Sequence, residues 1–192
     1  MKQIILASTS PRRNELLSKT GLKFKAVKSG YEEDMALNLK PKKLVEFLSK
    51  NKALAVMKKY PKAIIISGDT IIAYKDKVLG KPKSKIEAKK FLKMLSGKSH
   101  EVITAFTIFD CQTKKTITKS IPTKITMKKL TDKEIDWYIK TGEPLDKAGA
   151  YAIQGLGAMF ITKISGDYFA TVGLPVYQLV QELKKFGIEI IT

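Results

Sequence analysis

Two adjacent arginines near the N-terminus, Arg12 and Arg13, are the only arginines among the 36 basic residues of the chain. A guanidinium is planar and carries several donors, so it binds phosphate oxygens in a way that the ammonium group of lysine cannot. Ser10 is expected to cap a helix that begins at Pro11, which places both arginines in the first helical turn. Two cations there are favourable only when an anion joins them. The segment therefore predicts a phosphate site, with a solvated surface pair as the alternative.

Asp69 is the second residue that could do chemistry. It follows the strongly apolar segment 63–66, and we expect it at the C-terminal end of a buried strand, where ligand sites in α/β sheets are common. A carboxylate in such a place needs a cation, a metal or several N–H donors. It could hold Mg²⁺ or take a proton from a water molecule that attacks phosphorus. A structural role, as the cap of a turn, is the alternative.

Two lysines and an acidic cluster could complete a phosphate and metal site. Lys81 lies between Gly80 and Pro82, and Lys52 is predicted on the polar side of a long helix. Either ammonium could supply charge to phosphate oxygens, although lysines are common throughout this chain. Glu32 and Glu33 belong to an acidic cluster in a basic protein, and they could share a metal ion with Asp69 or lie in a solvated loop.

Gln154 is the candidate for recognition of a base. It ends a short apolar run within a segment that is rich in glycine and alanine, which permits close approach of the backbone to a ligand. The amide of glutamine offers a donor and an acceptor side by side. This arrangement complements the adjacent carbonyl and N–H of uracil or thymine, whereas a carboxylate would favour guanine.

The elements that must position these residues alternate between strands and helices, which indicates an α/β fold with a mixed sheet and helices outside it. The sequence contains no internal repeats, and the segment 144–175 shows little periodicity in its hydrophobic residues. Capping boxes are expected at Ser84–Glu87 and Thr131–Glu134. The expected strands are 2–7, 24–27, 63–66, 101–110, 116–128 and 188–191, and the expected helices are 11–19, 41–60, 84–95, 131–141 and 174–185.

Composition limits the class of protein. The 192 residues suit one domain or two small lobes, and 44% of them are hydrophobic. No run approaches the length of a membrane span, so we expect no membrane association. One cysteine and one histidine exclude a disulfide framework and a zinc site, and they fit a cytoplasmic protein. The net charge of +18 favours anionic ligands, but the lysines are spread evenly and no DNA-binding helix pattern occurs, so no specific nucleic-acid partner is expected.

Several segments together resemble the Maf family, whose members are nucleoside triphosphate pyrophosphatases once described as septum-formation inhibitors. The matching segments occur in the family's order and span nearly the whole chain. They are 6–17 (LASTSPRRNELL), 68–70 (GDT), 79–82 (LGKP), 95–100 (LSGKSH), 143–151 (EPLDKAGAY) and 173–175 (GLP).

The resemblance implies hydrolysis of a nucleoside triphosphate between the α and β phosphates, with a divalent cation, Mg²⁺ or Mn²⁺. It implies one Maf-like domain over residues 1–192, built on an elongated mixed β-sheet flanked by helices, with two lobes around a cleft, in a homodimer. Asp69 matches the family's catalytic carboxylate, and Glu33 or its neighbour Glu32 matches the acidic partner. The phosphate-binding set matches Ser8, Arg13, Lys52 and Lys81, and the positions that sort the family by base match Arg12, Thr70 and Gln154.

The combination of Arg12, Thr70 and Gln154 resembles the branch that acts on dTTP and UTP. Three alternatives remain open. The first keeps the reaction but acts on a purine or 7-methylguanosine triphosphate. The second is a non-catalytic regulator of cell division that binds a nucleotide as a signal. The third, motivated by charge alone, is a nucleic-acid-binding module.

Overall fold

The computed structural model describes residues 2–32, 37–75 and 77–190. Its strands belong to one mixed sheet in the order β2-β1-β3-β5-β6-β7, and β4 pairs with β3 outside this path. β1 is parallel to both β2 and β3, whereas the pairs β3–β4, β3–β5, β5–β6 and β6–β7 are antiparallel. The strands are Ile4–Leu6 (β1), Lys25–Ala26 (β2), Ile64–Tyr74 (β3), Lys77–Leu79 (β4), Ser99–Asp110 (β5), Thr116–Met127 (β6) and Ile161–Ser165 (β7).

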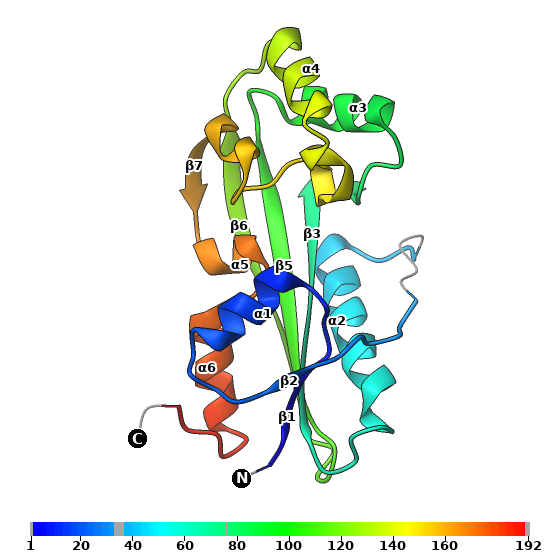
Figure 1. The fold of residues 1–192 in the computed structure, drawn as a ribbon, viewed down its shortest axis with the longest axis vertical. Helices are drawn as coiled ribbons and strands as arrows, with labels where there is room; N and C mark the ends of the chain where they lie inside the picture. Colours follow the sequence, from blue (N-terminus) through cyan, green and yellow to red (C-terminus); the bar gives the residue numbers. More distant parts are fainter. Residues whose placement is uncertain (1, 33–36, 76, 191–192) are drawn as a thin grey trace.

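Helices cover the sheet at both of its ends and form two lobes (Figure 1). We call the end that carries α1, α2 and α6 the lower lobe, and the end that carries α3, α4 and the 3₁₀ turns the upper lobe. The helices are Pro11–Ser18 (α1), Pro41–Met57 (α2), Lys85–Leu95 (α3), Asp132–Lys140 (α4), Tyr168–Val172 (α5) and Val176–Lys184 (α6). The 3₁₀ turns are Glu143–Asp146 (η1), Ala148–Ala150 (η2) and Leu156–Phe160 (η3).

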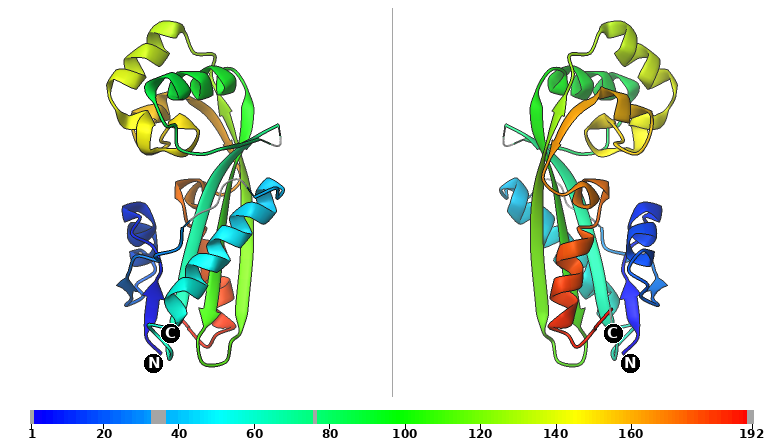
Figure 2. Two further views of the ribbon diagram at one scale, coloured as in Figure 1. Left: turned by 90° about the vertical axis from the view of Figure 1, so that its right-hand side faces the viewer. Right: turned by 90° about the vertical axis from the view of Figure 1, so that its left-hand side faces the viewer.

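The long strands β3, β5 and β6 connect the lobes. Ile64 pairs with Asp110 at one end of the β3–β5 ladder and Ala73 with Glu101 at the other. In the lower lobe α2 lies on one face of the sheet, and α1 and α6 lie on the opposite face (Figure 2). The upper lobe has its own core, in which α3 and α4 pack on the far ends of the same strands.

The helix starts confirm the local sequence signals. The side chain of Ser10 accepts the N–H of Arg13 at the start of α1, and Pro11 is the first helical residue. Thr131 and Glu134 form the expected capping box of α4. At α3, Ser84 caps the helix, but the carboxylate of its Glu87 accepts the N–H of Lys83 instead of the cap residue, so this box is incomplete. Among the described residues no helix has the length and apolar character that a bilayer crossing requires.

Two expectations about strands are wrong. Asp69 does not end a strand but lies in the middle of β3, because the apolar pattern of residues 71–73 continues the strand into the upper lobe. The segment 188–191 forms no strand over the three residues that are described, 188–190. Gly187 turns the chain with a φ of 71°, and Ile188 and Ile190 then pack against the lower core without joining the sheet.

Candidate active site

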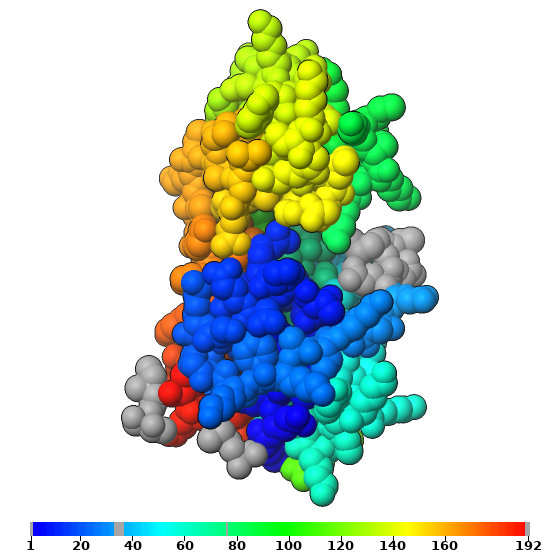
Figure 3. All heavy atoms as spheres, viewed as in Figure 1, coloured from blue at the N-terminus to red at the C-terminus, as the bar shows by residue number. Residues whose placement is uncertain are grey.

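A pocket of about 480 Å³ lies between the two lobes. Figure 3 shows the face where the N-terminal residues of the lower lobe, in blue, meet the yellow residues of the upper lobe. The pocket gathers seven of the residues that the sequence singled out, from five separate segments of the chain. They are Arg12, Arg13, Lys52, Asp69, Thr70, Lys81 and Gln154.

The alternation of β3 distributes its side chains to the two faces of the sheet. Ile65 packs on the face of α2, and the hydroxyl of Ser67 donates to the backbone carbonyl of Ser49 in that helix. Asp69 has the same parity and meets α2 as well. Thr70 has the opposite parity and faces α1. Asp69 and Thr70 therefore reach the pocket from opposite faces of β3, the first with a carboxylate and the second with a hydroxyl.

Asp69 forms an ion pair with Lys52 of α2. Both residues are buried, with 6% of Asp69 and 8% of Lys52 exposed. The prediction that Lys52 lies on a polar helix face is therefore wrong, because the position faces the sheet. Each charge compensates the other where neither is well solvated, and removing one partner would leave a buried charge at a cost of about 3–5 kcal/mol.

Arg13 is held by acceptors from three segments. Its Nε donates to the carbonyl of Gly173 at 2.9 Å, Nη2 donates to Oγ1 of Thr70 at 3.1 Å, and Nη1 donates to Oγ of Ser8 at 3.5 Å. The side chain passes over Gly68, where an added Cβ would lie 3.2 Å from Nε. Arg13 is thus fixed at the pocket wall, and Ser8, which is 8% exposed, lies behind it as part of its support.

A chain of hydroxyl groups continues from Arg13 into the sheet. Oγ1 of Thr70 lies 2.9 Å from Oγ1 of Thr104 on β5, and the hydroxyl of Thr104 donates to the carbonyl of Ala170 at 2.6 Å. Thr70 and Thr104 are paired directly across the β3–β5 ladder, so their side chains share one face. The chain of hydroxyl groups thus ties the pocket to α5.

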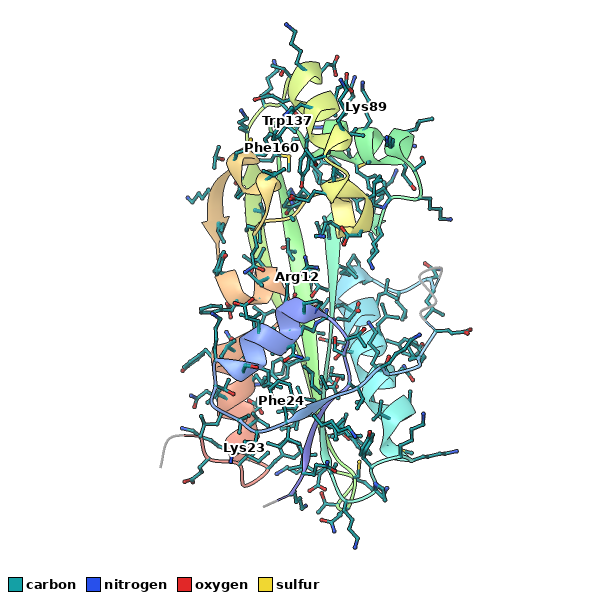
Figure 4. The ribbon with its side chains drawn as sticks, in the orientation of Figure 1. Arg12, Lys23, Phe24, Lys89, Trp137 and Phe160 are labelled. Atoms are coloured by element: carbon teal, nitrogen blue, oxygen red, sulfur yellow. The ribbon has the colours of Figure 1, made fainter. Side chains whose placement is uncertain are left out.

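The rim of the pocket carries charges of both signs. Arg12 at the start of α1 points toward the upper lobe (Figure 4). Across the pocket are Lys81, Asp146 and Lys147. The hydrogen bond from Lys147, and the positive charge of Arg12, hold the pKa of Asp146 below its usual value. The rim is thus cationic overall, which suits a polyphosphate.

The acidic partner expected at residue 32 or 33 is not placed at the pocket by the described residues. Glu32 is exposed in a coil, and Glu33 lies outside the described residues. Within the described ranges no three His, Cys, Asp or Glu side chains form a metal cluster. The carboxylate of Asp69, together with phosphate oxygens of a substrate, nevertheless fits a hard divalent cation, because Mg²⁺ is usually held by one or two carboxylates plus substrate phosphates.

Comparison with known proteins decides the family. The family model described as "Maf-like protein" matches residues 3–186. The chain belongs to the Maf family. Two curated relatives are each named "dTTP/UTP pyrophosphatase". The protein from Bacillus pumilus (strain SAFR-032) is 48% identical over 188 residues, covering 98% of both chains. The protein from Bacillus cytotoxicus is 47% identical over 186 residues, covering 97% of this chain and 96% of its own.

A solved structure supports the fold. The Ham1 protein of Staphylococcus aureus aligns with a TM-score of 0.55 over 97% of this chain and 100% of its own, at 12% sequence identity. At that identity the likeness concerns the fold alone. It agrees with the elongated mixed sheet that the resemblance to the Maf family implied.

Sequence reasoning missed several residues of this Maf pocket. Tyr151 and Lys147 line it, and Thr104 supports it from the next strand. Tyr151 and Lys147 belong to the segment 143–151 that carried the family resemblance, so a signal existed. Thr104 had no signal in the sequence, since its role depends on the register between β3 and β5.

Proposed function

We propose that this protein hydrolyses dTTP and UTP to the nucleoside monophosphate and pyrophosphate. The observation that carries the proposal is that the buried Asp69–Lys52 pair and both arginines of the chain line one pocket. The near full-length similarity to relatives named for the same activity supports the substrate class. The pocket is also large enough for a nucleotide, at about 480 Å³.

Within this proposal each charged residue has its own role. Arg12 and Lys81 contact phosphate oxygens from opposite sides of the pocket. Arg13 and the N-terminus of α1 stabilise negative charge that develops as the bond between the α and β phosphates breaks. Lys52 fixes the carboxylate of Asp69 and offsets its charge. Asp69 takes the proton from the water molecule that attacks phosphorus.

We further propose Mg²⁺ or Mn²⁺ as the cofactor. Asp69 and the phosphate oxygens would hold it, with Glu33, or Glu32, as the expected second carboxylate. When bound, a divalent cation offsets phosphate charge and lowers the pKa of coordinated water. A single Maf-like domain, a homodimer and a cytoplasmic location remain predictions, which light scattering and cell fractionation can test.

Substitution of Asp69 tests the proposed function. Asp69→Asn keeps the size of the side chain but removes the base, which commonly contributes about 10²–10⁴ in rate. We therefore expect pyrophosphate release from UTP, in the presence of Mg²⁺, to fall by at least about a hundredfold.

The chain offers a matched control. Asp110 on β5 is likewise buried and paired with a lysine, Lys2, at 2.7 Å, but it does not line the pocket. Asp110→Asn likewise removes a buried carboxylate that is paired with a lysine, here one whose side chain is 35% exposed, and should leave turnover close to wild type. If Asp69→Asn keeps more than about a tenth of wild-type activity, Asp69 is not the general base.

A further inference from the structure

The segment 152–157 forms part of the pocket wall and presents the residue that we assign to the base. Ala152, Ile153 and Gln154 line the pocket, and Gln154 is exposed at a turn. The backbone N–H groups on either side of this turn are bound by side chains. Two side chains from the upper lobe supply these contacts.

Tyr138 and Glu143 hold both ends of this segment. The hydroxyl of Tyr138 on α4 accepts the N–H of Ala152 at 3.1 Å and donates to Oε1 of Glu143 at 2.6 Å. The carboxylate of Glu143 also accepts the N–H of Leu156 at 2.9 Å and that of Gly157 at 3.1 Å. The Tyr138–Glu143 pair therefore binds the backbone on either side of Gln154.

Two glycines permit this close packing. A Cβ on Gly155 would lie 2.3 Å from Oε2 of Glu143, and a Cβ on Gly157 would lie 2.6 Å from the hydroxyl oxygen of Tyr138. Any larger residue at either position would push the segment off the pair. The two glycines thus allow this backbone to lie directly against Tyr138 and Glu143.

The electrostatics of the pair fix the direction of its hydrogen bond. Burial, and then the bond to Glu143, raise the pKa of Tyr138 far above its usual value. Burial opposes ionisation of Glu143, but the Tyr138 hydroxyl and the two backbone N–H groups outweigh it and hold the pKa of this carboxyl below its usual value. The proton therefore stays on Tyr138, and Glu143 remains an ionised acceptor for all three donors.

We propose that Tyr138 and Glu143 are positioning residues for base selectivity, because they hold the segment 152–157 and set both the place of Gln154 and the width of the pocket beside it. The proposal rests on the function proposed above. Neither side chain is among the described residues that line the pocket, so the effect passes through the backbone that they hold.

Tyr138→Phe tests the proposal with a small change. The ring and its edge-to-face packing on Phe160, with centroids 5.1 Å apart, are retained, while both hydrogen bonds of the hydroxyl are lost. We expect the ratio of kcat/KM for UTP to that for GTP to fall by about threefold to tenfold, the equivalent of one or two hydrogen bonds. The change should appear mainly as a higher KM for UTP, with kcat less affected. Glu143→Gln should shift the ratio in the same direction.

A control variant separates positioning from loss of stability. Thr131→Ala removes the N-cap of the same helix α4, which typically costs about 1 kcal/mol, without altering the Tyr138–Glu143 pair. Its ratio for UTP over GTP should equal that of the wild type. If the ratio in Tyr138→Phe stays within about twofold of wild type, the proposal is overturned.

A second measurement does not depend on turnover. Amide hydrogen exchange at Ala152, Leu156 and Gly157 should be faster in Tyr138→Phe than in the wild type, because their N–H groups lose an acceptor or its support. Unchanged exchange at all three amides would overturn the proposal. Failure of the wild type to hydrolyse UTP would contradict the proposed function instead, and the exchange result would still decide whether the pair holds the segment.

Discussion

At the scale of residues, Thr104 determines what Thr70 can offer to a substrate. The hydroxyl of Thr104 has one hydrogen, and it is donated to the carbonyl of Ala170. In the contact between the two threonines, Thr70 must therefore be the donor. Its oxygen accepts from Nη2 of Arg13, so the hydroxyl of Thr70 faces the pocket as an acceptor alone.

Thr104→Val removes this relay while keeping the shape of the side chain. Thr70 loses its acceptor and Arg13 loses a fixed partner, so we expect kcat/KM for UTP to fall by about threefold to tenfold. Thr104→Ser keeps the hydroxyl, so its kcat/KM for UTP should stay close to that of the wild type. Steady-state kinetics with UTP measures both effects.

Thr107 on the same strand provides the control. It is equally buried and also joins two hydroxyls, those of Ser49 and Thr118, but on the face of α2. Thr107→Val should cost stability without a comparable loss of kcat/KM. Equal kinetic losses in the two variants would show that Thr104 has no specific role at the pocket.

At the scale of elements, the features that could be predicted from the sequence are those that depend on residues adjacent in the chain. The start of α1 at Ser10 and Pro11 was predictable because capping is local. The burial of Lys52 was not, because the polar residue faces a sheet whose position the helix pattern alone does not reveal. The continuation of β3 past Asp69 was missed for a related reason, since the four residues 67–70 (SGDT) interrupt an apolar pattern that resumes in the second lobe.

The candidate site shows the same division. Arg12, Arg13 and Asp69 were identified by residue type and local context, and they do share one pocket. The support of Arg13 by Gly173 joins residues 160 positions apart, which no local signal encodes. β7 was also missed, because a short strand at the sheet edge next to β6 needs little periodicity of its own.

His100 on β5 links this element to the pocket wall and makes stability dependent on pH. It is 3% exposed and lies 2.6 Å from the hydroxyl of Tyr151 through Nε2. Burial lowers its pKa from 6.5 to about 4. Between these values the unfolded chain binds a proton that the folded chain does not, so this contribution to stability is complete above pH 6.5 and declines as the pH falls toward 4.

His100→Gln should remove this dependence. The difference in free energy of unfolding between wild type and variant should decrease by roughly 3 kcal/mol between pH 7 and pH 4. Urea unfolding at several pH values measures it. A difference that stays constant across this range would show that His100 titrates normally in the folded protein.

At the scale of the whole molecule, the two lobes share their strands. The cores of both lobes are built on β3 and β5, whose ladder is continuous past the pocket. Because the same strands contribute to both cores, unfolding of one core disturbs the other. We therefore expect the lobes to unfold together, as the prediction of a single domain requires.

Leu17→Ala tests this coupling from the lower lobe. Leu17 is fully buried there, and its truncation should cost about 2–5 kcal/mol. Trp137 on α4 reports on the upper lobe, and its fluorescence transition should shift to lower denaturant by the same amount as the far-UV circular dichroism (Figure 4). A Trp137 transition that does not move would indicate lobes that unfold independently.

The shared strands also place the reactive groups. The Lys52–Asp69 pair comes from the lower lobe, while Lys81 and Gln154 face it from upper-lobe segments. A substrate bound between the lobes would thus be contacted by both. In the proposed function its triphosphate would contact the cationic groups, and its base would contact the segment around Gln154.

The products formed from UTP test this account most directly. ³¹P NMR of UTP incubated with the protein and Mg²⁺ should show uridine monophosphate and pyrophosphate appearing in equal amounts, and the Asp69→Asn variant should leave UTP unchanged. Formation of uridine diphosphate and orthophosphate, or no turnover by the wild type, would contradict it.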